Sequence, residues 1–117
     1  MDLKDLVRAL LAYDSLVARQ WVVDATRGGL DWRRVPAPEG LDPVAMAVAA
    51  GVTELLASRA GQSPPAWTAE VPAVPEPVFL VRAAAKLPRL RRSCEQEGPE
   101  PLRRRGVLAP PEFLTAA

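Results

Sequence analysis

Few side chains in this 117-residue sequence are suited to catalysis. Histidine, the commonest general base and metal ligand, is absent. The single cysteine, Cys94, excludes an internal disulfide and multi-cysteine metal clusters, and it has no histidine to activate it as a nucleophile. Arg27-Gly28-Gly29-Leu30 lacks the glycine spacing and the lysine of a phosphate-binding loop. We therefore expect no enzymatic activity and no bound cofactor.

The aspartates near the N-terminus also give no sign of a metal site. They show neither calcium-loop nor paired-carboxylate spacing, so we expect them to cap helices or to face solvent. They are Asp2, Asp5, Asp14 and Asp24. The sequence therefore predicts no metal ion.

Arginine is concentrated in the C-terminal third, where residues 82–105 hold eight basic and three acidic side chains. Seven of these eight cations are arginine, whose guanidinium group binds carboxylates and phosphates through two parallel hydrogen bonds. This pattern predicts a partner-binding role, and a solvated helix face followed by a basic tail is the alternative. The arginines assigned to partner binding are Arg89, Arg92, Arg103, Arg104 and Arg105.

Apolar side chains accompany these arginines. The segment from Gly106 to Leu114 is apolar but contains two adjacent prolines, so it cannot form a core of its own. Either it folds back on the helices, or it becomes ordered on a partner with Phe113 and Leu114 as anchors. Trp67 and Phe79 complete the set of predicted partner-binding residues.

A DNA-binding function is a second hypothesis. Residues 47–59 match the spacing of a helix-turn-helix with Gly51 at the turn, and Thr53 and Arg59 would contact DNA. The charge of Glu54 and the apolar residues after it do not suit a helix that reads base edges. Because the net charge of the whole chain is only +1, nucleic acid is the less favoured partner.

Helices are the elements expected to position these residues. Asp2 begins an amphipathic helix with apolar residues from Leu3 to Leu11, and Asp14 or Ser15 begins a second helix. The second helix ends at Gly28-Gly29 and carries four residues inward, namely Val17, Trp21, Val22 and Ala25. Asp42-Pro43 begins a third, alanine-rich helix that runs to about residue 60.

The second half of the chain is divided by proline. Five prolines within residues 62–77 predict an extended strap without helix, which Trp67, Val71 and Val74 pin to the helices. Residues 78–87 and 88–97 are expected to form two further helices, before a tail from Glu100. The predicted fold is therefore all-α, with four to five short helices, the extended strap and an extended C-terminal tail, and no sheet is required anywhere.

The predicted organisation is one domain with three parts. Residues 1–61 form an N-terminal helical bundle, residues 62–77 the proline-rich strap, and residues 78–117 a basic helical segment with its tail. The longest apolar run, residues 44–52, is too short to cross a bilayer, and the acidic N-terminus is unlike a signal peptide. We therefore expect a cytoplasmic protein without a membrane partner, whereas the sequence leaves its oligomeric state open.

Proline and arginine motifs between residues 62 and 114 carry a family resemblance. They are Pro64-Pro65-Ala66-Trp67-Thr68, Pro75-Glu76-Pro77-Val78-Phe79-Leu80, Leu87-Pro88-Arg89-Leu90-Arg91, Pro101-Leu102-Arg103-Arg104-Arg105-Gly106-Val107 and Pro110-Pro111-Glu112-Phe113-Leu114. Together they resemble small bacterial proteins that look like the antitoxin partners of nucleotidyltransferase-like or other toxin enzymes. The resemblance implies a non-enzymatic protein that neutralises a cognate toxin by covering its active-site surface. Under this hypothesis, we expect residues 103–105 to pair with acidic residues of the toxin.

Overall fold

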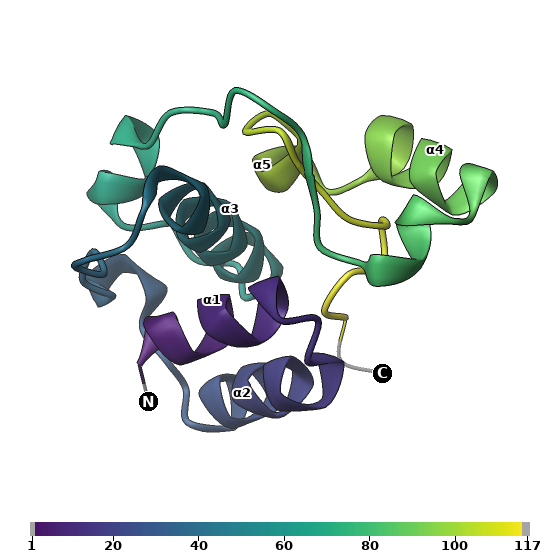
Figure 1. The fold of residues 1–117 in the computed structure, drawn as a ribbon. Coiled ribbons are helices and arrows are strands. Elements are labelled where there is room, and N and C mark those ends of the chain that lie inside the picture. Colours follow the sequence, from purple (N-terminus) through teal and green to yellow (C-terminus); the bar gives the residue numbers. More distant parts are fainter. Residues whose placement is uncertain (1, 116–117) are drawn as a thin grey trace.

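The computed structural model describes residues 2–115 (Figure 1). These residues are mostly helical, which confirms the all-α prediction. The α-helices are α1 (Leu3–Leu11), α2 (Ser15–Arg27), α3 (Pro43–Arg59), α4 (Pro88–Glu97) and α5 (Glu100–Arg103). Short 3-10 helices are η1 (Trp32–Arg34), η2 (Ala66–Glu70) and η3 (Arg82–Ala85), and the strands are β1 (Val78–Phe79) and β2 (Val107–Leu108). None of the helices within residues 2–115 has the length and apolar run needed to cross a bilayer.

Helices α1 and α2 form the predicted hairpin. The Asp2 and Asp14 side chains accept hydrogen bonds from the backbone amides of Lys4 and Val17, as expected of helix caps. The inward stripe of α2 begins at Ala18, and the prediction that Val17 points inward is wrong, because Val17 is half exposed. Tyr13 joins the helices at a φ of 59°, a left-handed conformation that turns the chain sharply.

Helix α3 lies at the centre of the fold, between the hairpin and the C-terminal segments (Figure 1). It begins at the predicted cap, where the Asp42 carboxylate accepts a hydrogen bond from the Ala45 amide at 2.8 Å. It is buried continuously from Ala47 to Ala57, because α1, η1, η2 and α5 surround it. Its small residues allow these neighbours to approach closely.

The helix-turn-helix centred on Gly51 is wrong, because α3 is one unbroken helix across this position. Gly51 faces α5, where a methyl group in place of its hydrogen would lie 2.6 Å from Leu102 Cδ2. Thr53, the expected DNA contact, is fully buried. Glycine therefore serves close helix packing here.

The prediction of a helix over residues 78–87 is wrong. Strand β1 pairs in parallel with β2, with Val78 opposite Val107 and Phe79 opposite Leu108, and only residues 82–85 are helical. Pro75 and Pro77 keep the preceding backbone extended, and the tail supplies pairing groups nearly 30 residues away in sequence. The fold therefore contains a two-stranded sheet that the sequence did not require.

The strap over residues 62–77 is extended apart from η2, so the prediction that none of it is helical is wrong for residues 66–70. Pro64 and Pro65 lie just before η2, where missing amide hydrogens cost nothing. Trp67 pins the strap as predicted, because its Nε1 donates a hydrogen bond to the Val35 carbonyl oxygen at 2.8 Å. Val74 packs against the main core and its amide bonds to the Arg105 carbonyl oxygen.

Helix α4 belongs to a small second core at one side of the molecule (Figure 1). Ala84, Cys94 and Leu108 are buried together there, with Phe79, Val81 and Leu90 packed around them. Strand β2 links this core to the main one, since Val107 belongs to the main core and Leu108 to the second. The second core holds η3 and α4 in place and leaves their outer faces open.

Candidate protein-binding surface

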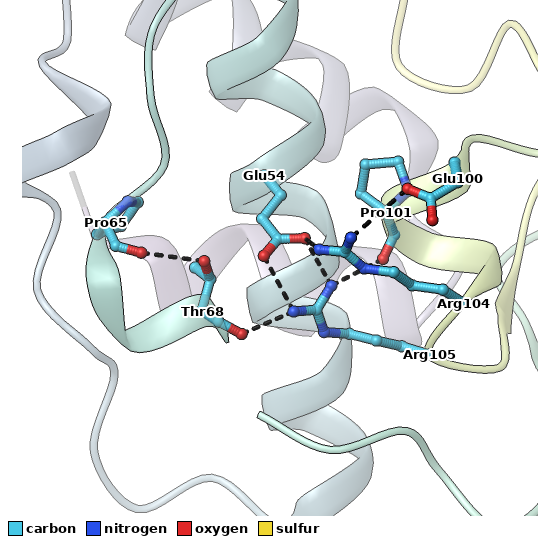
Figure 2. Close-up of polar contacts among 7 residues, drawn as sticks. All are labelled: Glu54, Pro65, Thr68, Glu100, Pro101, Arg104 and Arg105. Carbon is cyan, nitrogen blue, oxygen red and sulfur yellow. Dashed lines mark hydrogen bonds and ion pairs between the residues drawn. The ribbon is translucent and has the colours of Figure 1, made fainter. Parts of the chain in front are cut away.

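The arginine run at residues 103–105 does not lie together on the surface. The Arg105 side chain is 5% exposed and points at Glu54 of α3 (Figure 2). Its Nη1 and Nη2 atoms donate to Glu54 Oε1 at 2.6 Å and Oε2 at 3.0 Å, and also to the carbonyl oxygens of Pro101 and Thr68. Arg105 therefore ties together α3, η2 and α5, and its guanidinium group is not available to a partner in this fold.

Arg104 also contacts Glu54, and it reaches Glu100 at 3.6 Å on its exposed side (Figure 2). Burial alone raises the pKa of Glu54, but the hydrogen bond from Arg105 and the charges of both arginines outweigh it and lower this pKa. Glu54 is therefore ionised at neutral pH. Arg103 is exposed, and its Nη1 donates to the Gln96 carbonyl oxygen.

The C-terminal segment folds back on the helices, the first of the two alternatives. Phe113 is 9% exposed and belongs to the main core, and Leu114 packs against that core. Arg59 Nη1 donates to the Phe113 carbonyl oxygen at 2.5 Å and so fixes the segment to α3. Phe113 is therefore an intramolecular anchor.

Of the other predicted residues, Trp67 lies on η2 and packs against the main core, and three lie on the second lobe, formed by residues 78–98. Arg89 and Arg92 are exposed on α4, and neither forms an ion pair within residues 2–115. Phe79 is half buried beneath Arg91, whose guanidinium carbon lies 5.1 Å from the ring centre. Arg91 also pairs with Glu95. Of the nine predicted residues, Arg89, Arg92 and Arg103 are exposed cations without an ion-pair partner within residues 2–115, and Arg103 donates a hydrogen bond to the Gln96 carbonyl oxygen.

Two further cations on this lobe were not among the predicted site residues. Arg82 and Lys86 are exposed on and just after η3, and neither has an ion-pair partner in the described part of the chain. With Arg89 and Arg92 they form a basic surface, and we keep this name for these four residues. The sequence showed that cations are frequent within residues 82–92. The helix expected over residues 78–87 gave no indication that these cations would lie apart from the arginines at 103–105.

A cleft of about 440 Å³ lies beside the basic surface. One wall is the end of the α1–α2 hairpin with Tyr13 and Ala18, and the other is η3 with Arg82 and Ala83. The yellow C-terminal segment in Figure 1 runs between these walls, and Phe113 contributes to the floor. The sequence did not indicate this cleft, because its walls are about 70 residues apart in the chain and η3 was expected to be part of a longer helix.

The Arg82 guanidinium carbon lies 5.1 Å from the centre of the Tyr13 ring, so a cation–π contact spans the cleft walls. Exposed large apolar side chains gather at the same end of the hairpin. Of the five on the described surface, four belong to residues 11–17, namely Leu11, Tyr13, Leu16 and Val17. Scattered apolar side chains are normal on protein surfaces, but this local concentration marks a candidate contact region.

The side chains that could act as a nucleophile or bind a metal ion do not form a site on this surface. Cys94 is fully buried, and burial, with the nearby charges of Glu112 and Glu95, raises the pKa of its thiol. Within residues 2–115, no group of three or more metal-binding side chains converges. The features that stand out are therefore the basic surface and the cleft beside it.

Comparisons with protein-family models, with curated proteins and with solved structures found no match to this chain.

Proposed function

We propose that this chain is a non-enzymatic protein-binding module that docks its basic surface against an acidic face of a protein partner. One observation carries the proposal: four exposed cations lie within eleven residues, and the described chain offers none of them a carboxylate. Arginine is enriched at protein interfaces, where its planar group binds carboxylates bidentately.

The position of the basic surface also supports the proposal. Cys94 and Leu90 hold α4 against the second core, so the cations lie on a folded element rather than on a flexible tail. A rigid surface loses less conformational entropy when it binds. Exposed charges of this kind raise the rate of association and make binding sensitive to salt.

An antitoxin-type role is the specific form of this proposal, and the resemblance described above supports it. In this form the partner is a toxin enzyme, such as one of nucleotidyltransferase type, whose acidic active-site residues face Arg89 and Arg92. Residues 103–105 were expected to make that contact, but Arg105 is occupied by Glu54. The proposal therefore moves the contact to α4.

The test begins with capture of the tagged full-length chain from its source cells, with nuclease treatment so that nucleic acid cannot bridge. We expect one stoichiometric protein. A chain shortened before Glu100 is unsuitable as a control, because it loses the core residues Leu102, Val107 and Phe113. The test therefore uses the full-length chain with the charges of selected arginines reversed.

Arg89→Glu with Arg92→Glu is expected to weaken the purified complex by about tenfold or more and to reduce its salt dependence. Arg8→Glu with Arg27→Glu is the matched control, because both arginines are exposed on the hairpin and the net change in charge is the same. Equal loss of affinity in both pairs, or no captured protein, contradicts the proposal. Capture that disappears with nuclease treatment points instead to nucleic acid. For the antitoxin form, co-expression of the chain with the captured enzyme must restore growth.

A further inference from the structure

The cleft lies where a partner on the basic surface would reach it. Arg82 belongs to both features, since it is one of the four cations and also lines the cleft. Lys86 and Arg89 follow along the same lobe. A segment that binds at Arg82 therefore meets positive charge and the cleft at the same place.

The interior of the cleft is mainly apolar. Leu10, Leu80, Val81 and Phe113 line it, together with Ala18 and Ala83, while Asp14, Arg19 and Glu112 contribute charged side chains of both signs. Its volume of about 440 Å³ lies within the range of cavities that hold small ligands. Such a space accommodates a large apolar side chain, which hydrophobic burial would stabilise.

The Tyr13 ring lines the cleft and lies outside the core, in contact with Arg82. Tyr13 is 43% exposed, and its backbone has a φ of 59°, which is costly for a bulky residue. The ring is therefore only partly buried, and the guanidinium group of Arg82 lies over its face. A partner side chain that enters beside Tyr13 would cover this exposed ring.

We propose that the cleft receives an apolar anchor side chain from an acidic segment of the same protein partner, while carboxylates of that segment pair with Arg82 and its neighbours. This inference rests on the proposed function and adds the chemistry of the segment that binds. An amphipathic helix fits both features, because residues three or four apart lie on one face and can present a leucine or an aromatic ring next to glutamate.

Three synthetic peptides test this inference by fluorescence anisotropy with the full-length chain. The first is an amphipathic helix with leucines on one face and glutamates along its edges. The second replaces the leucines by serine, and the third replaces the glutamates by lysine. We expect the first peptide to bind at least about tenfold more tightly than the other two, because only it satisfies the cleft and the basic surface together.

Ala83→Leu and Ala85→Leu form a matched pair of variants. Both alanines are exposed on η3, but only Ala83 lines the cleft. We expect A83L to remove the preference for the leucine peptide over the serine peptide, and A85L to keep it. Equal melting temperatures of the two variants and the parent establish that both fold.

The outcomes separate this inference from the proposed function. If the leucine and serine peptides bind equally, or if A83L and A85L behave alike, the cleft is not the anchor site and the charge-based function stands. If none of the peptides binds while duplex DNA does, both proposals fail. Backbone amide shifts on addition of the leucine peptide provide a second measurement, and they should move at Tyr13 and Ala83 but not at Leu16, which lies on the outer side of α2.

Discussion

Removal of the Glu54 charge tests whether the buried carboxylate holds the two halves of the chain together. Glu54→Gln keeps the size of the side chain but leaves the guanidinium group of Arg105 buried without a counter-charge. Both oxygens of Glu54 accept hydrogen bonds from Arg105 in the folded protein, and Oε1 also contacts Arg104. The substitution therefore disturbs α3, η2 and α5 at one point.

The expected loss is large. Breaking a buried ion pair by removal of one partner costs about 3–5 kcal/mol, a substantial part of the 5–15 kcal/mol that stabilises a typical domain. At roughly 2.1 cal/mol/K per residue, 117 residues give an unfolding entropy of about 0.25 kcal/mol/K. A loss of about 4 kcal/mol then lowers the melting temperature by roughly 16 °C.

Glu100→Gln is the matched control, because it makes the same chemical change in the other carboxylate near Arg104. Glu100 is 62% exposed and lies 3.6 Å from Arg104, so its removal should cost about 1 kcal/mol or less. Thermal and urea unfolding at pH 7 measure both variants. Similar losses in E54Q and E100Q would refute the reasoning, because the buried and exposed carboxylates would then be equivalent.

The pH dependence follows from the same geometry. Because folding lowers the pKa of Glu54, its ionised form stabilises the folded state above the ordinary value of 4.5, and this contribution is lost as the pH falls through the lowered pKa. The parent chain should therefore lose more unfolding free energy than E54Q between pH 5 and pH 3. Parallel pH profiles of the two proteins would contradict the assigned role.

Three further predictions concern other contacts. Gly98→Ala places a methyl group against the Ala109 carbonyl oxygen and 2.6 Å from the Cys94 carbonyl oxygen, so urea unfolding should show a loss of about 1–3 kcal/mol. Trp67→Phe removes the hydrogen bond to Val35 and should cost about 1 kcal/mol in the same assay. Because burial raises the pKa of the Cys94 thiol, the folded chain should react with a thiol reagent at pH 8 roughly tenfold or more slowly than the chain unfolded in guanidinium.

Local patterns predicted the first half of the fold well. The caps at Asp2, Asp14 and Asp42 each accept the expected kind of backbone hydrogen bond, because helix capping depends on residues only two or three positions apart. Trp21, Val22 and Ala25 of α2 are buried as expected, so the inward face of this helix was predicted correctly. Val17 lies in the first turn of α2 and is half exposed, and Ala18 is the buried residue there.

Long-range pairing accounts for the errors in the second half. Val78 and Phe79 form a strand because residues 106–108 pair with them. The residues close to them in sequence give no indication of this pairing. The burial of Arg105 was missed for the same reason, since its partner Glu54 lies 51 residues earlier in the chain. In the sequence the charge of Glu54 served only as an argument against DNA binding. The sequence therefore indicated the charge of the candidate surface and two of its four residues, Arg89 and Arg92, but not Arg82, Lys86 or the cleft beside them.

The separation of the arginines into two sets determines where an acidic partner can bind. Glu54 and Glu100 neutralise much of the charge around Arg104 and Arg105, so the sequence excess of positive charge within residues 82–105 is expressed mainly at Arg82, Lys86, Arg89 and Arg92. At physiological ionic strength, salt screens interactions between exposed charges beyond about 8 Å. Attraction to a carboxylate-rich face is therefore a local property of this lobe. Mutations of Arg104 and Arg105 should consequently act on binding through stability, whereas mutations of Arg89 and Arg92 should act on binding directly.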